Sequence, residues 1–137
     1  MTEAAGEGAG LKDFLKRIFT LKHRKHKRYR VEEGLAATVD SELFPGDQIV
    51  NIGLGGLTFN WVARGEPLPD KFEIDLHLDG KLYLEKLKVK LISNIEAGDI
   101  SYSSKNIRRI SVQFLSLTPI QEFDIKALIK SHGIEEI

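Results

Sequence analysis

A strongly basic stretch lies near the start of this 137-residue chain, at HRKHKRYRV, residues 23–31. Five of its nine residues are Lys or Arg, and the arginines Arg24 and Arg28 are four positions apart. A guanidinium group can bind two phosphate oxygens at once and can stack on a flat base. The stretch therefore suits a multiply charged anion, although arginines at this spacing also occur by chance in a solvated basic run.

A second candidate is NIGLGGL, residues 51–57, which begins 23 residues after Arg28. Glycines allow backbone N–H groups to come close to a ligand, and the side chain of Asn51 is short and polar. Alone, the same residues would also make an ordinary glycine-rich hairpin in which Asn51 caps a turn. Together the two stretches are more informative, because one offers cations and the other offers backbone that a ligand can approach.

Other kinds of chemistry find no support in the sequence. The chain has no cysteine, and the spacing of its histidines does not match a zinc site. No serine lies in a nucleophile elbow, no GK[ST] motif is present, and the acidic residues occur mostly singly on polar strand faces. We therefore predict no metal site, no catalytic residues and no enzymatic activity. The histidines are His23, His26, His77 and His132.

The formal net charge of zero hides an uneven distribution of charge. Residues 1–30 contain nine Lys/Arg and three Asp/Glu, whereas residues 31–137 contain eleven and seventeen. A basic segment beside an acidic body indicates either a local anion site or a tail held on its own domain by electrostatic attraction. Charge alone does not choose between them.

Residues 1–20 are predicted to be a flexible N-terminus followed by an amphipathic helix. Residues 1–10 are rich in Gly, Ala and Glu. Residues 11–19 carry apolar side chains at the spacing of one helix face, which we expect to pack on the chain's own domain or on a partner rather than on a membrane. These apolar residues are Leu11, Phe14, Leu15, Ile18 and Phe19.

Targeting signals are not evident in the sequence. No window of about 18 apolar residues occurs, and the N-terminus lacks the basic and apolar regions of a secretory signal. The absence of cysteine fits a reducing compartment. We therefore expect a cytoplasmic protein without a transmembrane helix.

After residue 30 the apolar residues alternate with the period of a β-strand. The clearest case is FEIDLHL, residues 72–78, and the Asp79-Gly80 pair that follows is a strong signal for a two-residue hairpin turn. A slip in the next strand indicates a β-bulge near Glu85-Lys86. Residues 94–106 are expected to form a polar loop.

Helical spacing returns after Pro119 and ends at Gly133, as expected for a helix that begins with proline and stops at glycine. Strands with hairpin connections favour a small barrel. We therefore predict an all-β fold, a six-stranded antiparallel β-barrel over residues 30–117, with a C-terminal helix at 119–131.

The order and spacing of the two polar stretches resemble the PilZ domain family, the bacterial receptor modules for cyclic di-GMP. That family is marked by RxxxR just before the first strand and by [D/N]xSxxG in the turn between the next two strands. Arg24 and Arg28 match the first motif, and Asn51 and Gly56 match the two ends of the second. The resemblance covers residues 24–130, including the late strand RRISVQF, and residues 21–137 are assigned to the domain.

The resemblance implies a non-enzymatic receptor that grips cyclic di-GMP between the basic stretch at residues 23–31, here called the basic arm, and the glycine-rich turn. It implies no cofactor, and a protein partner drawn from motility, exopolysaccharide or regulatory machinery would receive the signal. No nucleic acid is expected as a partner. The ligand-binding residues carried over from the motifs are Arg24, Arg28, Asn51, Gly53 and Gly56. Additional candidates in the basic arm are Arg30, Lys27 and Tyr29.

One motif position departs from the family, because Gly53 stands where the motif has serine. A hydrogen bond to a charged group contributes about 1.5–3 kcal/mol, so the missing hydroxyl could weaken binding by about one or two decades. We expect Gly53→Ser to tighten binding if residue 53 has a negative φ, and to strain the turn if φ is positive.

Two other functions stay open. The first is a domain of the same family that binds no nucleotide and docks on a partner protein, for which Gly53 is the sequence support. The second is binding of single-stranded nucleic acid through aromatic residues, which the acidic body opposes. The aromatic candidates are Tyr29, Phe59, Trp61 and Tyr83.

Overall fold

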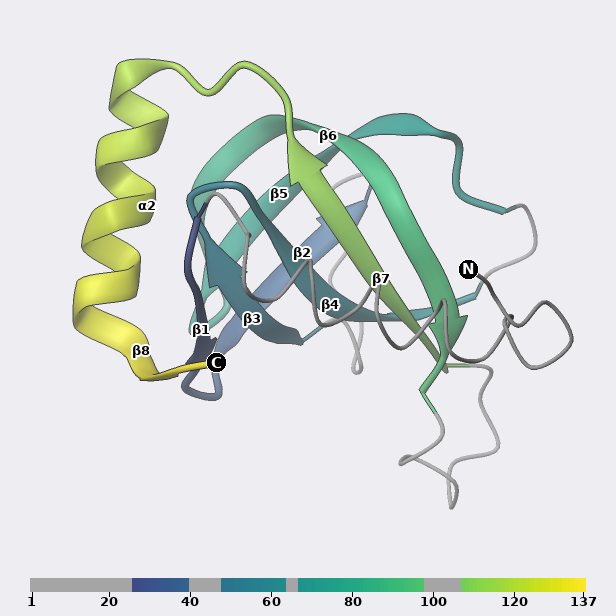
Figure 1. The fold of residues 1–137 in the computed structure, drawn as a ribbon, viewed down its shortest axis with the longest axis horizontal. Coiled ribbons are helices and arrows are strands. Elements are labelled where there is room, and N and C mark those ends of the chain that lie inside the picture. Colours follow the sequence, from purple (N-terminus) through teal and green to yellow (C-terminus); the bar gives the residue numbers. More distant parts are fainter. Residues whose placement is uncertain (1–25, 40–47, 64–66, 98–106) are drawn as a thin grey trace, which may run out of the picture.

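The computed structural model describes residues 26–39, 48–63, 67–97 and 107–137. Within them the chain forms eight β-strands and one helix, α2 (Pro119–His132) (Figure 1). The helix predicted at 11–19 lies outside the described residues. The strands are β1 (Arg28–Val31), β2 (Leu35–Val39), β3 (Ile49–Gly53), β4 (Gly56–Val62), β5 (Lys71–Leu78), β6 (Lys81–Glu96), β7 (Ile107–Phe114) and β8 (Gly133–Glu136).

The strands form one curled antiparallel sheet in the order β2-β5-β6-β7-β4-β3-β1-β8. In this order β2 and β3 are the two ends of a group of six strands. Ala36 of β2 forms a bridge with Gln48, directly before β3, so the six strands curl until these two ends meet. The prediction of an antiparallel barrel built from six strands is confirmed. Strands β1 and β8 were not separate elements of that prediction, and they extend the sheet beyond β3 (Figure 1).

The β5–β6 hairpin forms for the reasons that its sequence indicates. Asp79 and Gly80 have φ angles of 51° and 81°, the pair of positive values that a tight hairpin turn needs. Lys86 has a φ of 56°, and the β5–β6 register shifts opposite it, which confirms the predicted bulge.

Strand β6 is longer than the sequence analysis allowed. Residues 94–96 were assigned to a polar loop, but they continue the strand because Asn94 and Glu96 pair with Ile110 and Arg108 of β7. Arg108 also donates from Nε to the Asn94 side-chain oxygen at 2.8 Å. Polar side chains therefore support this end of the strand, where the apolar alternation is lost.

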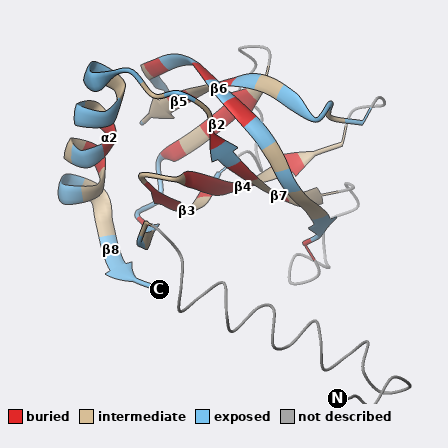
Figure 2. Cartoon of the chain, turned by 45° about the horizontal axis from the view of Figure 1, so that its top comes forward, coloured by how far each residue is buried: buried red, intermediate tan, exposed pale blue. Residues whose placement is uncertain are grey.

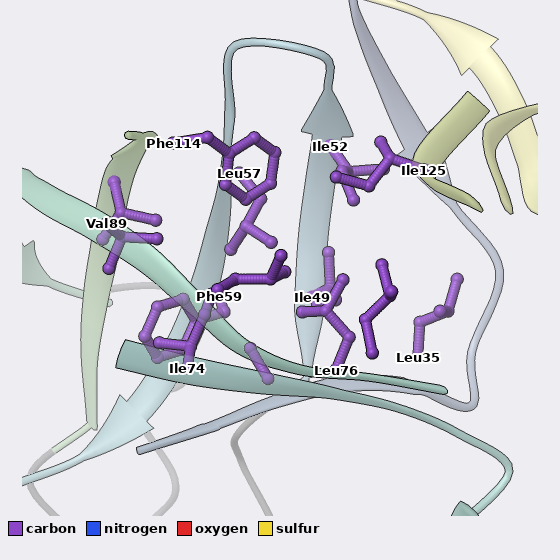
Figure 3. Packing of buried hydrophobic residues seen from close by; sticks show 14 of the residues in the cluster. Leu35, Ile49, Ile52, Leu57, Phe59, Ile74, Leu76, Val89, Phe114 and Ile125 are labelled. Atoms are coloured by element: carbon purple, nitrogen blue, oxygen red, sulfur yellow. The ribbon is translucent and has the colours of Figure 1, made fainter. Parts of the chain in front are cut away.

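The core fills the inside of the curled sheet, and α2 packs against one side of it (Figures 2 and 3). The helix contributes Ile125 and Leu128, both fully buried, and Ile125 lies beside Ile52 of β3 in Figure 3. Apolar residues of the strands supply the remaining core. Those that are fully buried with the largest side chains are Phe59, Leu35, Ile49, Ile52, Leu57, Ile74, Leu76, Leu87, Ile110 and Val89.

Hydrogen bonds fix where α2 begins and hold it against the sheet. The Thr118 hydroxyl accepts from the Gln121 backbone N–H at 3.1 Å, and the Gln121 side chain accepts from the Thr118 N–H at 3.0 Å. Tyr83 of β6 donates its hydroxyl to the Asp124 carbonyl at 2.8 Å. Burial, and then the Asp124 carboxylate, raise the pKa of Tyr83, so this donor stays protonated to a higher pH.

In the part of the chain that the structure describes, no helix is long and apolar enough to cross a membrane. Nor does that part contain a group of three or more His, Cys, Asp or Glu side chains that could hold a metal ion.

Candidate functional site

The candidate site begins at β1, which lies between β3 and β8. Arg28 is opposite Gly53 in the β1–β3 register, and Arg30 is opposite Asn51. Because side chains alternate along a strand, Arg28 and Asn51 lie on the same face of this pair. The Arg28 Nη1 donates to the Asn51 Oδ1 at 2.9 Å. Two residues singled out from different sequence motifs are therefore in direct contact.

The glycines of the β3–β4 turn allow this close contact between strands. A Cβ on Gly53 would overlap the Lys27 carbonyl oxygen, and one on Gly56 would overlap the Val112 carbonyl oxygen. The Gly56 Cβ would also lie 3.0 Å from Nη2 of Arg28. Neither glycine has a positive φ, so the lack of space, rather than backbone conformation, requires glycine at these positions.

An open cleft of about 730 Å³ lies beside Arg28 and Asn51. This volume lies in the range of about 300–1,000 Å³ that is usual for small-molecule sites. The wall contains a cation, an amide, hydroxyl groups and apolar side chains. The lining residues are His26, Arg28, Asn51, Leu54, Gly55, Thr58, Ile92, Ser93, Ser111, Gln113, Phe114, Leu117 and Glu122.

Hydroxyl groups form one part of the cleft wall. Thr58 of β4 and Ser111 of β7 are paired across the two strands, and their hydroxyl oxygens are 2.9 Å apart. Glu122 is the acidic residue among the described lining residues, and Lys126 pairs with it at 3.2 Å. A surface with a guanidinium group, hydroxyls and apolar patches suits a ligand that has both anionic and flat apolar parts.

The additional candidates Arg30, Lys27 and Tyr29 do not line this cleft. Arg30 donates from Nε to Glu135 at 2.8 Å and also contacts the same carboxylate oxygen through Nη2 at 2.7 Å. Lys27 and Tyr29 line a second cavity of about 400 Å³, which α2 borders through Lys126, Ile129 and Lys130. Of the two arginines of the arm that the structure describes, Arg28 lines the larger cleft and Arg30 does not.

Arg24 lies outside the described residues, so its predicted role stays a prediction. Of the other motif residues, Arg28, Asn51, Gly53 and Gly56 are brought together around one turn. Sequence reasoning did not single out Thr58, Ser111 or Gln113 as site residues. Their apposition depends on which strands pair, and no local signal in the sequence reports that pairing.

The nucleic-acid alternative loses most of its aromatic surface. Phe59 is fully buried and Trp61 is buried, and both belong to the core cluster. Tyr83 donates to Asp124 of α2. A row of exposed aromatic rings on which single-stranded bases could stack is therefore not formed by these candidates.

Comparison with known proteins gives structural matches only. No known family model matches the chain, and no curated protein matches it in sequence. The crystal structure of YcgR in complex with c-di-GMP, from Escherichia coli, matches with a TM-score of 0.54 and 17% identity, over 80% of this chain and 45% of that chain. The chain thus spans less than half the length of that protein.

A second solved structure, the PilZ domain of Escherichia coli YcgR with c-di-GMP, matches with a TM-score of 0.52 and 17% identity. This match covers 80% of the present chain and 90% of the other. The chain therefore has a PilZ-like fold, which confirms the fold that the sequence motifs implied.

Proposed function

We propose that this protein is a non-enzymatic receptor for cyclic di-GMP, which binds in the cleft beside Arg28. The observation that carries the proposal is the Arg28–Asn51 hydrogen bond, which joins the two motif stretches at the wall of a ligand-sized cleft. The two similar solved structures, both of which hold c-di-GMP, support the choice of ligand.

The residues of the cleft suit the chemistry of this dinucleotide. Its phosphates need cationic donors, and Arg28, with Arg24 as the second motif arginine, provides guanidinium groups that can bind phosphate or stack on guanine. Asn51 holds Arg28 in position and offers an amide to the ligand. Leu54, Ile92 and Phe114 give apolar surface for the flat faces of the bases.

Calorimetric titration with cyclic di-GMP tests the proposal. We expect Arg28→Ala to weaken binding by roughly tenfold to a hundredfold, because a hydrogen bond to a charged group is lost. Arg24→Ala should have an effect of the same size. Arg28→Lys should recover only part of the affinity, since Lys keeps the charge but not the planar fork.

Arg108→Ala is a matched control for Arg28→Ala. Arg108 also donates to an asparagine on the neighbouring strand, Asn94, but it does not line the cleft. Its loss should leave the affinity unchanged. Equal affinities for the parent, Arg28→Ala and Arg24→Ala would remove both arginines from the site, and no binding to the parent would reject the ligand.

A second candidate function is a protein-interaction module that binds no nucleotide. On α2, Ile120 and Phe123 are 73% and 68% exposed, and their spacing places them on one face of the helix. Exposed apolar side chains of this kind suit a protein contact. In the receptor proposal the same face is the candidate contact for the partner that receives the signal.

A further inference from the structure

Strand β1, which carries Arg28, is held on its outer side by β8. Strand β8 pairs with β1 in antiparallel register, with Tyr29 opposite Glu136 and Arg30 opposite Glu135. The Ile137 N–H, just beyond β8, donates to the Arg28 carbonyl at 3.0 Å. Arg28 therefore has β3 on one side and the C-terminal segment on the other.

Side chains reinforce this backbone pairing along the same strand. Glu135 contacts both Nε and Nη2 of Arg30, at 2.8 and 2.7 Å. Glu136 lies 3.7 Å from the Lys27 ammonium group. These pairs are half exposed, so each contributes little alone, but both hold the same short strand against the arm.

Helix α2 gives β8 a fixed place on the barrel. Ile125 and Leu128 anchor the helix in the core, and β8 begins at Gly133, directly after the last helical residue. The Gly133 N–H closes the helix on the Ile129 carbonyl. A Cβ on Gly133 would lie only 2.6 Å from that carbonyl oxygen, so glycine permits the tight change from helix to strand.

We propose that β8 is a positioning strand for Arg28, which couples docking of the C-terminal segment to binding at the cleft. The inference rests on the proposed binding of cyclic di-GMP. An arm that is already held loses less conformational freedom when the ligand binds, so docked β8 tightens binding. By linkage, the bound ligand stabilises docked β8 by the same factor.

The charge of β8 makes this proposal distinguishable from simple electrostatics. Glu135 and Glu136 place two carboxylates on residues that flank Arg28, namely Arg30 and Lys27, and their charge alone would weaken the binding of an anion. The positioning effect of β8 would instead strengthen binding. A variant that removes acidic charge and breaks the pairing at once therefore separates the two explanations.

The first experiment removes one backbone donor. Ile137→Pro deletes the N–H that bonds to Arg28, whereas the matched control Ile137→Ala keeps it and changes only an exposed side chain. We expect faster amide exchange over residues 28–31 without ligand and about threefold to tenfold weaker binding of cyclic di-GMP in Ile137→Pro. Ile137→Ala should match the parent in both measurements.

The second experiment uses charge reversal and needs no proline. Glu135→Arg places a like charge beside Arg30, so we expect about twofold to fivefold weaker binding even though the protein gains positive charge. The exchanged pair Arg30→Glu with Glu135→Arg should bind more tightly than Glu135→Arg alone, because it re-forms an ion pair between β1 and β8. Tighter binding by Glu135→Arg would overturn positioning in favour of electrostatics.

Two further outcomes separate failure of this inference from failure of the proposed function. Faster amide exchange in Ile137→Pro with unchanged affinity would show that β8 holds the arm without affecting the site, and would overturn the inference alone. If calorimetry detected no binding of cyclic di-GMP to the parent, the proposed function would be overturned. The coupling between docked β8 and ligand binding would then be overturned as well.

Discussion

The β5–β6 turn and the β3–β4 turn both contain glycine, but the space around their glycines differs. Gly80 has a φ of 81°, and nothing lies within 4 Å of the position that its Cβ would take. Gly53 and Gly56 have ordinary φ angles, and a Cβ on either would overlap a backbone carbonyl oxygen. In the first turn glycine permits a backbone conformation, and in the second it lets neighbouring strands approach around Arg28.

The largest expected effect is that of Gly56→Ala. The new methyl group would overlap the Val112 carbonyl and crowd Arg28, and backbone cannot move aside as a flexible side chain can. We expect a loss of about 3 kcal/mol in the free energy of unfolding. We also expect weaker binding of cyclic di-GMP, because the guanidinium group must shift.

Chemical denaturation and calorimetry of Gly56→Ala check both expectations. An unfolding midpoint equal to that of the parent would show that β4 and β7 separate easily here. The contrast between the two turns would then lose its physical basis.

The second expected effect is that of Gly53→Ser. The family resemblance favoured tighter binding, because serine is the usual residue at this motif position, and Gly53 does not have the positive φ that would have opposed it. The structure adds the Lys27 carbonyl oxygen, which the serine Cβ would overlap, so the arm must move away from β3. We expect a loss of about 1–3 kcal/mol in the free energy of unfolding and weaker ligand binding.

Gly53→Ala is the control, because it adds the same Cβ without the hydroxyl. Melting curves and titrations of the two variants separate crowding from hydrogen bonding. A Gly53→Ser protein that melts like the parent and binds more tightly than Gly53→Ala would show that the arm yields and that the hydroxyl limits affinity.

The smallest expected effect is that of Gly80→Ala. Open space surrounds the turn, so the cost comes only from the positive φ and should be about 1 kcal/mol in the free energy of unfolding. Gly80→Asn should recover part of it, since asparagine tolerates this conformation better. Binding of cyclic di-GMP should not change in either variant, and a change in affinity would connect this turn to the cleft.

The sequence predicted those parts of the fold that depend on residues close together in the chain. The alternation of residues 72–78, the Asp79-Gly80 turn and the Pro119 helix start each depend on neighbours in the chain, and the structure confirms all three. Strand β8 was not predicted, because GIEE has no apolar alternation. It becomes a strand only by pairing with β1, about a hundred residues earlier.

The candidate site was predictable to a smaller extent. The motif residues Arg28 and Asn51 were found by resemblance, and the structure places them in contact. The role of Arg30 was left open, and only the pairing with Glu135 shows where its side chain lies. The space around Gly53 depends on tertiary approach between strands, which neither composition nor periodicity reports.

Strand β8 also changes what the sheet presents at its end. Without β8, the outer edge of β1 would expose unpaired N–H and C=O groups, which can act as a template for a strand of another chain. With it, the final strand of the order is only four residues long and carries Glu135 and Glu136. A short, acidic edge is one of the devices by which natural sheets avoid edge-to-edge aggregation.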